Sequence, residues 1–263
     1  MSTALHEATT WPMDLHTQVQ REIASRQLAE HLVRLRERGP LKVLDVGCGP
    51  ATPSLLLARA GHLVTAVSTD TLQLTALHDE MAADSDDVRA RLRLVEGDGS
   101  EAGRHFPPGS FDLALCHGVV DGLAEPDGML AALARILNPG GLLSVTASNG
   151  AAAPMRPGSA GEWTATRKAL AARTVAANAS GNAEGNRTDS VEGLSTMLAD
   201  LGAPMLAWYG VGVFSALRPD DPAPPRKGKA WQNLIAVEEE AGRTDPYRAI
   251  AGVLHVVGEK TVR

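Results

Sequence analysis

Two glycines and an aspartate after a short apolar run are the residues best suited to bind a ligand. The sequence VLDVGCGPA at 43–51 places Asp45, Gly47 and Gly49 where a strand turns into a helix. Glycine lets the chain bend sharply there and leaves backbone N–H groups open to a ligand, because no Cβ covers them. Asp45 can accept hydrogen bonds from a ligand amine. A tight strand–helix turn without any ligand is the alternative interpretation of this motif.

The motif differs from the fingerprint of dinucleotide-binding proteins. Its form is D-x-G-x-G, and Thr52 takes the position of the third glycine in G-x-G-x-x-G. A nicotinamide-dependent oxidoreductase is therefore disfavoured. Other landmarks follow in order along the chain: VEGDGS at 95–100, FDLALCHG at 111–118 and LNPGGLL at 137–143.

The elements that would position these residues alternate regularly. Strand and helix patterns alternate about five times within 41–148, which predicts parallel strands joined by helical crossovers. An amphipathic helix is expected from about Leu15 to Arg38, and a helix at 71–81 with Asp70 as its N-cap. Further helices at 191–201 and 231–241 and strands at 204–214 and 251–259 follow. We predict an α/β fold with a doubly wound, mostly parallel seven-stranded sheet, an N-terminal helix and an inserted lid.

These landmarks resemble the class I S-adenosylmethionine-dependent methyltransferases, and the resemblance covers about 41–148. It implies a Rossmann-like single domain over 1–263 with S-adenosyl-L-methionine as the cofactor. The implied parts are a flexible start at 1–12, a cofactor-binding core at 41–148, a lid or acceptor insertion at 150–190, and elements at 191–263 that complete the sheet.

A narrower resemblance extends beyond the core. The matching elements are similar to those of the tRNA carboxymethoxyuridine carboxyl-methyltransferase family. They are Arg21, Gly61-His62-Leu63-Val64, Cys116 to Asp121, Gly210 to Phe214, Glu238 and Glu240, Pro246-Tyr247, and His255-Val256. The matches indicate common ancestry over most of the length, but they do not establish a common substrate.

The resemblance implies a role for individual residues. Arg21 would bind the methionine carboxylate, Asp98 would accept from the adenine amine, and His117 would flank the methyl group. A solvated arginine, a turn-capping aspartate and a packed histidine are the respective alternatives. The expected cofactor-binding residues are Arg21, Asp45, Gly47, Cys48, Gly49, Ser68, Asp98, Gly99, Ser100 and His117. His117 and Asp121 are the candidate catalytic residues, as bases for an acceptor that must lose a proton, and His255 is a third titratable residue to test in this role.

The sequence also departs from these families. Ser68 stands where an acidic residue commonly binds both ribose hydroxyls, and Asp70 would compensate if the loop turned it inward. Gly212 and Gly252 stand where arginines are expected, and the tract at 178–190 is nearly uncharged. Fewer cations weaken the hold on phosphates, so these departures disfavour a tRNA substrate.

Composition agrees with that interpretation. The net charge is −6 and aromatic residues make up 3% of the chain, which argues against a broad nucleic-acid-binding surface. Cys48 and Cys116 show neither disulfide nor metal-ligand spacing, so no metal is expected. The start of the chain lacks a secretory pattern, and glycines and prolines interrupt the uncharged stretch at 136–155. We expect a cytoplasmic protein without a membrane partner, and the sequence leaves its oligomeric state open.

The predicted function is methyl transfer from S-adenosylmethionine, by in-line displacement, to a small-molecule O or N acceptor. Two alternatives remain open. One is a tRNA wobble-uridine carboxyl methyltransferase. The other is a non-catalytic S-adenosylmethionine-binding protein, for which Ser68 is the best support.

Overall fold

The computed structural model describes residues 14–49, 53–123, 125–176, 188–218 and 228–262. The expected flexible start at 1–12, Thr52 and most of the uncharged tract at 178–190 lie outside these ranges.

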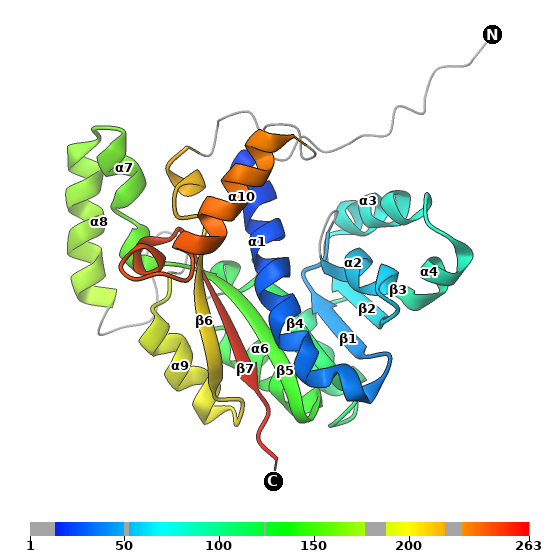
Figure 1. Ribbon diagram of the computed structural model, residues 1–263. Helices are drawn as coiled ribbons and strands as arrows, with labels where there is room; N and C mark the ends of the chain where they lie inside the picture. Colours follow the sequence, from blue (N-terminus) through cyan, green and yellow to red (C-terminus); the bar gives the residue numbers. More distant parts are fainter. Residues whose placement is uncertain (1–13, 50–52, 124, 177–187, 219–227, 263) are drawn as a thin grey trace.

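The described residues form a seven-stranded sheet in the order β3-β2-β1-β4-β5-β7-β6 (Figure 1). Neighbouring strands among β1 to β5 pair in parallel, and β7 pairs antiparallel with both β5 and β6. The prediction of a mostly parallel, seven-stranded sheet is thus confirmed. The strands are β1 Lys42–Val46, β2 Leu63–Ser68, β3 Leu92–Glu96, β4 Phe111–His117, β5 Leu137–Ser148, β6 Met205–Val211 and β7 Val253–Glu259.

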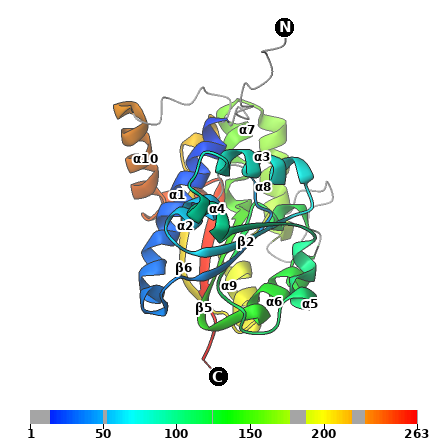
Figure 2. The same ribbon diagram turned by 90° about the vertical axis from the view of Figure 1, so that its right-hand side faces the viewer.

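Helices cover both faces of the sheet, and Figure 2 shows α1 and α10 on one side and α5 and α6 on the other. The first helix layer contains α1 Leu15–Leu32, α2 Pro53–Arg59, α3 Thr71–Met81 and α10 Lys229–Ala241, and the second contains α5 Ala102–His105, α6 Asp127–Ile136 and α9 Val191–Asp200. Side chains alternate along each strand, so Leu113 and Leu115 pack against the first layer, whereas Ala114 and Cys116 pack against the second.

Three outer helices complete the described part. They are α4 Asp86–Arg91, α7 Met155–Ser159 and α8 Trp163–Ala176. In Figure 1, α7 and α8 lie on the opposite side of α1 from α2 and α3. Both α7 and α8 lie in the segment 150–190 that was expected to form the inserted lid.

Two helix boundaries test the local rules. Asp70 caps α3 as predicted, because its Oδ1 accepts from the backbone N–H groups of Leu72 at 2.9 Å and Gln73 at 3.3 Å. The N-terminal helix ends earlier than predicted: the α-helix stops at Leu32 and a 3₁₀-helix, Val33–Arg38, follows. The short helix α4 was not predicted, since its polar sequence has no apolar repeat.

The turns that follow β1 and β4 pack tightly against each other. Val46 of β1 lies opposite Cys116 of β4, so the two strands end side by side. Gly47 has φ +75°, and a Cβ placed there would lie 2.1 Å from Cγ2 of Val119. Such a junction, where the strand order reverses, is where α/β sheets bind ligands at their carboxyl ends.

Gly47→Ala tests this close approach, and Gly39→Ala is its matched control. Both glycines have φ +75°, but a Cβ at Gly39 would meet nothing within 4 Å. We expect Gly39→Ala to lower the free energy of unfolding by about 1–2 kcal/mol from backbone strain alone. Gly47→Ala should cost about 1–3 kcal/mol more, because of the overlap with Val119. Urea unfolding measures both, and equal losses would contradict the packing argument.

Candidate functional site

Polar side chains gather beneath α1 at the carboxyl end of the sheet. Asp45 of β1, His117 of β4, Ser144 of β5 and His255 of β7 continue the side-chain rows that are apolar farther back along the strands. Asp45, Ser144 and His255 are at most 2% exposed. Gln27 of α1 is fully buried above them. Buried polar groups must be paired, so their partners determine what this region can do.

Asp45 lies between two first-layer helices. Ser54 of α2 donates its hydroxyl proton to Oδ2 of Asp45 at 2.6 Å. Burial raises the pKa of the Asp45 carboxyl to about 7, and both the Ser54 bond and the positive charge of Arg21 on α1 oppose that rise. Two predicted cofactor-binding residues, Arg21 and Asp45, therefore lie within electrostatic reach of each other. Ser54 was not predicted from the sequence.

Two backbone N–H groups of the glycine loop after β1 are paired within the protein, which differs from the prediction. The N–H groups of Gly47 and Cys48 donate to the carbonyl of Val67 at 2.8 and 3.4 Å, so β2 takes donors that were expected to be open to a ligand. Burial raises the pKa of the Cys48 thiol to about 12, which keeps it protonated. Gln73 of α3 lies against the loop, since a Cβ on Gly49 would be 2.6 Å from its Oε1.

At the end of β2, Asp70 does not take the inward position in which it would compensate for Ser68. Its exposed carboxylate caps α3 and is not turned inward. Ser68 is buried, and its Oγ accepts from the N–H of Asp70 at 3.1 Å. Gln73, whose side chain lies against Gly49, was not predicted from the sequence, because it lies in the first turn of the next helix, where no motif marks it.

The residues that follow β3 form a tight turn. Asp98 is exposed, and its Oδ1 accepts from the N–H of Ser100 at 2.8 Å. Gly99 is buried against β1, and a Cβ there would lie 2.0 Å from Cγ1 of Val46. Asp98 thus caps this turn, and the capping hydrogen bond uses one of its two carboxylate oxygens.

The two candidate catalytic residues have different surroundings. Nε2 of His117 lies 2.8 Å from Oγ of Ser144, and burial lowers the pKa of His117 to about 4, so its ring is neutral near pH 7. Both oxygens of Asp121 accept from Ser148: from the N–H at 2.8 Å and from the hydroxyl at 2.7 Å. Asp121 therefore fastens the turn after β4 to the end of β5.

The two glycines that replace expected arginines lie close together. Gly212 has φ +71°, and a Cβ there would be 2.7 Å from Cε1 of His16. A Cβ at Gly252 would be 2.7 Å from the Cβ of Ala216. Neither position has room for a larger side chain unless its neighbours move. Two buried atoms near Gly212, Nδ1 of His16 and Oγ of Ser215, have no hydrogen-bond partner within the described ranges.

Glu238 builds the turn that carries Ser215. Its fully buried carboxylate accepts from the N–H groups of Val213, Phe214 and Ser215 at 2.7, 3.2 and 2.6 Å. Two of the elements that carry the narrower resemblance, Glu238 and the segment 210–214, are thus direct neighbours in the fold.

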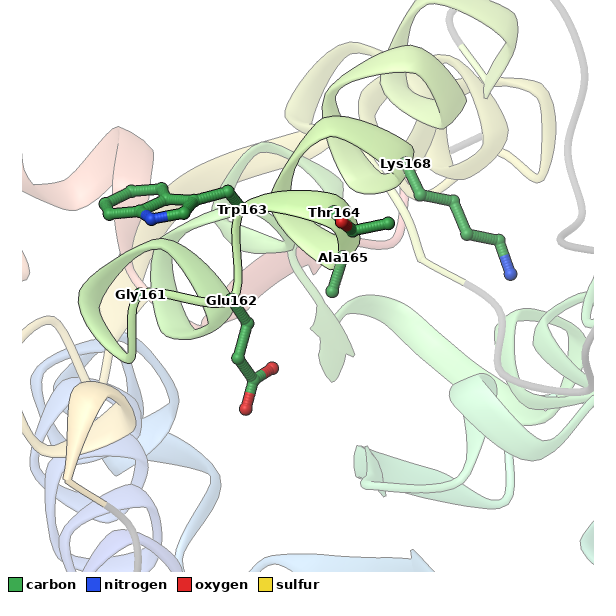
Figure 3. Close-up of a pocket in the computed structure, with 6 residues that line it drawn as sticks. All are labelled: Gly161, Glu162, Trp163, Thr164, Ala165 and Lys168. Atoms are coloured by element: carbon green, nitrogen blue, oxygen red, sulfur yellow. The ribbon is translucent and has the colours of Figure 1, made fainter.

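The inserted helices carry a shallow surface pocket. Figure 3 shows Trp163 and Lys168 extending in different directions from α8. The lining residues are Gly161, Glu162, Trp163, Thr164, Ala165 and Lys168. Trp163, which lies in the segment expected to form the lid, is 72% exposed. The pocket is therefore separate from the polar residues at the ends of β1 and β4.

The described residues contain no group of three or more His, Cys, Asp or Glu side chains placed to hold a metal ion. Within the same ranges, no helix is both long enough and apolar enough to cross a membrane.

Comparisons with known proteins find methyltransferases. Residues 44–145 match the family described as methyltransferase domain. A ubiquinone biosynthesis O-methyltransferase from Xanthomonas campestris pv. campestris (strain B100) is 34% identical over 110 residues, which is 41% of this chain and 43% of the relative. A protein of the same name from Paracidovorax citrulli (strain AAC00-1) is 33% identical over 102 residues, 38% of this chain and 40% of the relative. The chain thus spans less than half the length of these curated relatives.

Solved structures extend the likeness to almost the whole chain. The 1,6-didemethyltoxoflavin-N1-methyltransferase of Burkholderia thailandensis, with bound S-adenosylhomocysteine, has a TM-score of 0.54 at 17% identity and covers 94% of this chain and 81% of its own. The [4+2]-cyclase SpnF has a TM-score of 0.56 at 20% identity, with 95% and 94% covered. The chain has the class I methyltransferase fold. At these identities the likeness establishes the fold alone.

Asp45→Asn tests the environment of the buried carboxyl. The pKa of Asp45 is about 7 in the folded protein and 3.8 in the unfolded chain, so the folded state binds the proton more tightly. The Asp45 contribution to stability is therefore greatest below pH 4 and is lost as the pH rises to about 7. Relative to Asp45→Asn, the wild type should lose about 4 kcal/mol of unfolding free energy between pH 4 and pH 8.

Urea unfolding across this pH range measures the difference. Ser54→Ala is the matched control, because it removes a bond that lowers the pKa and should move the loss to higher pH. A pH-independent difference between wild type and Asp45→Asn would show that the carboxyl is not perturbed.

Proposed function

We propose that the protein is a methyltransferase that uses S-adenosyl-L-methionine to methylate an oxygen or nitrogen of a small molecule. The observation that carries the proposal is the buried Asp45 carboxyl at the carboxyl end of β1, beside the glycine loop, where the positive charge of Arg21 lowers its pKa against the effect of burial. The match of residues 44–145 to a methyltransferase domain supports it, as do relatives named O-methyltransferases. We further expect the protein to act in the cytoplasm.

The polar residues present fit the charges of this cofactor. Arg21 would bind the methionine carboxylate through a charge-assisted hydrogen bond. Asp45 would face the cationic amine, and this positive charge would favour the ionised carboxylate, which burial alone disfavours. The loop with Gly47, Cys48 and Gly49 would allow the cofactor to approach the backbone.

The nucleoside would contact the ends of β2 and β3. Ser68 and Gln73 would bind the ribose hydroxyls in place of the usual acidic residue, because Asp70 is engaged in capping α3. Asp98, Gly99 and Ser100 would border the adenine, with the second carboxylate oxygen of Asp98 available to its amine.

The cofactor supplies a methyl group on a positively charged sulfur. The chain must hold the acceptor atom in line with the departing sulfur, which is chiefly a positioning effect. His117 at the end of β4 would lie beside the acceptor. Nδ1 of His16 and Oγ of Ser215 offer buried polar contacts for a distant group of the acceptor.

A small acceptor is favoured over tRNA by the environment of the lost arginines. The Gly212 position is packed against His16 and the Gly252 position against Ala216, so the cations expected for tRNA are absent from both. The net charge of −6 agrees with this preference. The contact between Glu238 and residues 213–215 favours the tRNA carboxyl methyltransferase as the second candidate, since that family shares both elements.

A non-catalytic cofactor-binding protein is the other alternative. A neighbour of the same fold is named a [4+2]-cyclase, so the fold by itself does not specify methyl transfer. Formation of S-adenosylhomocysteine with any acceptor would exclude this alternative.

Arg21→Gln tests cofactor binding, with Arg26→Gln as the control on the same helix. Arg26 is exposed and paired with Glu22 at 2.8 Å and Glu239 at 3.3 Å. Loss of a charge-assisted hydrogen bond costs about 1.5–3 kcal/mol, so Arg21→Gln should weaken S-adenosylmethionine binding at least tenfold. Arg26→Gln should bind like the wild type. Calorimetric titration measures the affinities, and equal affinities for both variants would contradict the role of Arg21.

Transfer of labelled methyl groups tests the acceptor class. The protein is incubated with labelled S-adenosylmethionine and, separately, with a panel of phenols, catechols and amines or with bulk tRNA. We expect label in the small molecules and none in nucleoside digests. Label in the digests would establish the tRNA alternative instead.

A further inference from the structure

Four hydrogen bonds connect His117 on the central strand β4 to Gly210 on the edge strand β6 through the protein interior. Nε2 of His117 lies 2.8 Å from Oγ of Ser144, which lies 2.8 Å from Nε2 of His255. Nδ1 of His255 lies 2.8 Å from Oε1 of Gln27, whose Nε2 lies 3.2 Å from the carbonyl oxygen of Gly210. Ser144, His255 and Gln27 are fully buried. This chain of hydrogen bonds thus connects β4, β5, β7, α1 and β6.

The last member of this chain fixes the direction of every bond. The carbonyl of Gly210 can only accept, so the amide NH₂ of Gln27 donates to it and the amide oxygen faces His255. That oxygen can only accept, so Nδ1 of His255 carries a proton. In a neutral ring, Nε2 of His255 then accepts the hydroxyl proton of Ser144. Because the Ser144 hydroxyl has one proton, its oxygen accepts from Nε2 of His117.

The neutral state of His255 is essential to this assignment. If both of its nitrogens carried protons, Nε2 would donate to Ser144, and the serine proton would point toward His117 instead. Burial lowers the pKa of His255 well below its usual value, and the neighbouring titratable rings of His117 and His31 also lower it. The ring of Tyr209 packs against His255 with centroids 5.9 Å apart, which helps to exclude water.

His117 is left with its proton on Nε2 and a lone pair on Nδ1. Within the described residues, Nδ1 has no hydrogen-bond partner. On the basis of the proposed function, we infer that Nδ1 of His117 is the general base that removes a proton from a hydroxyl or N–H acceptor. Ser144, His255 and Gln27 are positioning residues that hold His117 in this tautomer.

The step balances without any other reactant. As the acceptor oxygen or nitrogen bonds to the methyl carbon, the carbon–sulfur bond breaks and its electron pair leaves with the sulfur. The acceptor proton passes to Nδ1 of His117, and the imidazolium later releases it to water. A carboxylate acceptor has no proton to lose at neutral pH and needs no base. The inferred substrate class is therefore an alcohol, phenol or amine rather than a carboxylate.

Nitrogen NMR of histidine-labelled protein tests the tautomers directly and without any acceptor. Long-range proton–nitrogen spectra at pH 7.5 should show His117 neutral with its proton on Nε2, and His255 neutral with its proton on Nδ1. The variants His117→Gln and His255→Gln assign the signals. A proton on Nδ1 of His117, or a doubly protonated His255, would overturn the inference.

Kinetics with an accepted small molecule test the functional part. His117→Gln should lower kcat by about 10²–10⁴-fold. Ser144→Ala, which breaks the chain, should lower kcat at least tenfold with KM nearly unchanged, whereas Ser144→Thr keeps a hydroxyl and should restore most of the rate. Calorimetry with S-adenosylmethionine shows whether each variant still folds and binds.

The outcomes separate the two proposals. Absence of S-adenosylmethionine binding by the wild type would reject the proposed function. Binding and methyl transfer with an unchanged kcat in His117→Gln would reject the base alone. Gln27→Met provides a further check, because it removes the anchor to Gly210 and should make His117 populate both neutral tautomers in the NMR spectra.

Discussion

The tight packing of the turns at the carboxyl ends of β1, β3 and β4 is the constraint on which the site depends. Gly47 lies against Val119, and Gly99 lies against Val46, with no room for a Cβ at either contact. These approaches bring the glycine loop, the turn after β3 and His117 to one edge of the sheet. Parallel strands make such an edge possible, because each crossover helix returns the chain to the same end.

The second constraint is the pairing of buried polar groups beneath α1. The rows that contain Leu113, Leu115 and Leu142 farther back become polar at His117 and Ser144, so one helix must cover both kinds of surface. It does so with Leu28 on the apolar part and Gln27 on the polar part. An unpaired polar atom there would cost about 1–3 kcal/mol, and the hydrogen bonds of Ser144, His255 and Gln27 avoid that cost.

Local sequence patterns were sufficient for the sheet and for residues that lie in motifs. The capped helix at 71–81 and the glycine turn at 47–49 follow from spacing alone. Gln27, Ser144 and Gln73 could not be found that way, since each is a single polar residue in an otherwise ordinary helix or strand. Gln27 and His255 are 228 residues apart in the chain, so their pairing depends on tertiary structure. The same limit applies to Asp121, whose bonds to Ser148 no motif predicts.

Two independent parts of the molecule favour the same class of acceptor. On the β6–β7 side, Gly212 has a backbone conformation that favours glycine and is packed against His16. An arginine at this position would not fit unless its neighbours moved. On the β4 side, a buried chain of hydrogen bonds leaves a lone pair on His117, which a carboxylate acceptor would not need. The first observation argues against a polyanionic partner and the second against a carboxyl acceptor. The small alcohol, phenol or amine proposed above agrees with both observations.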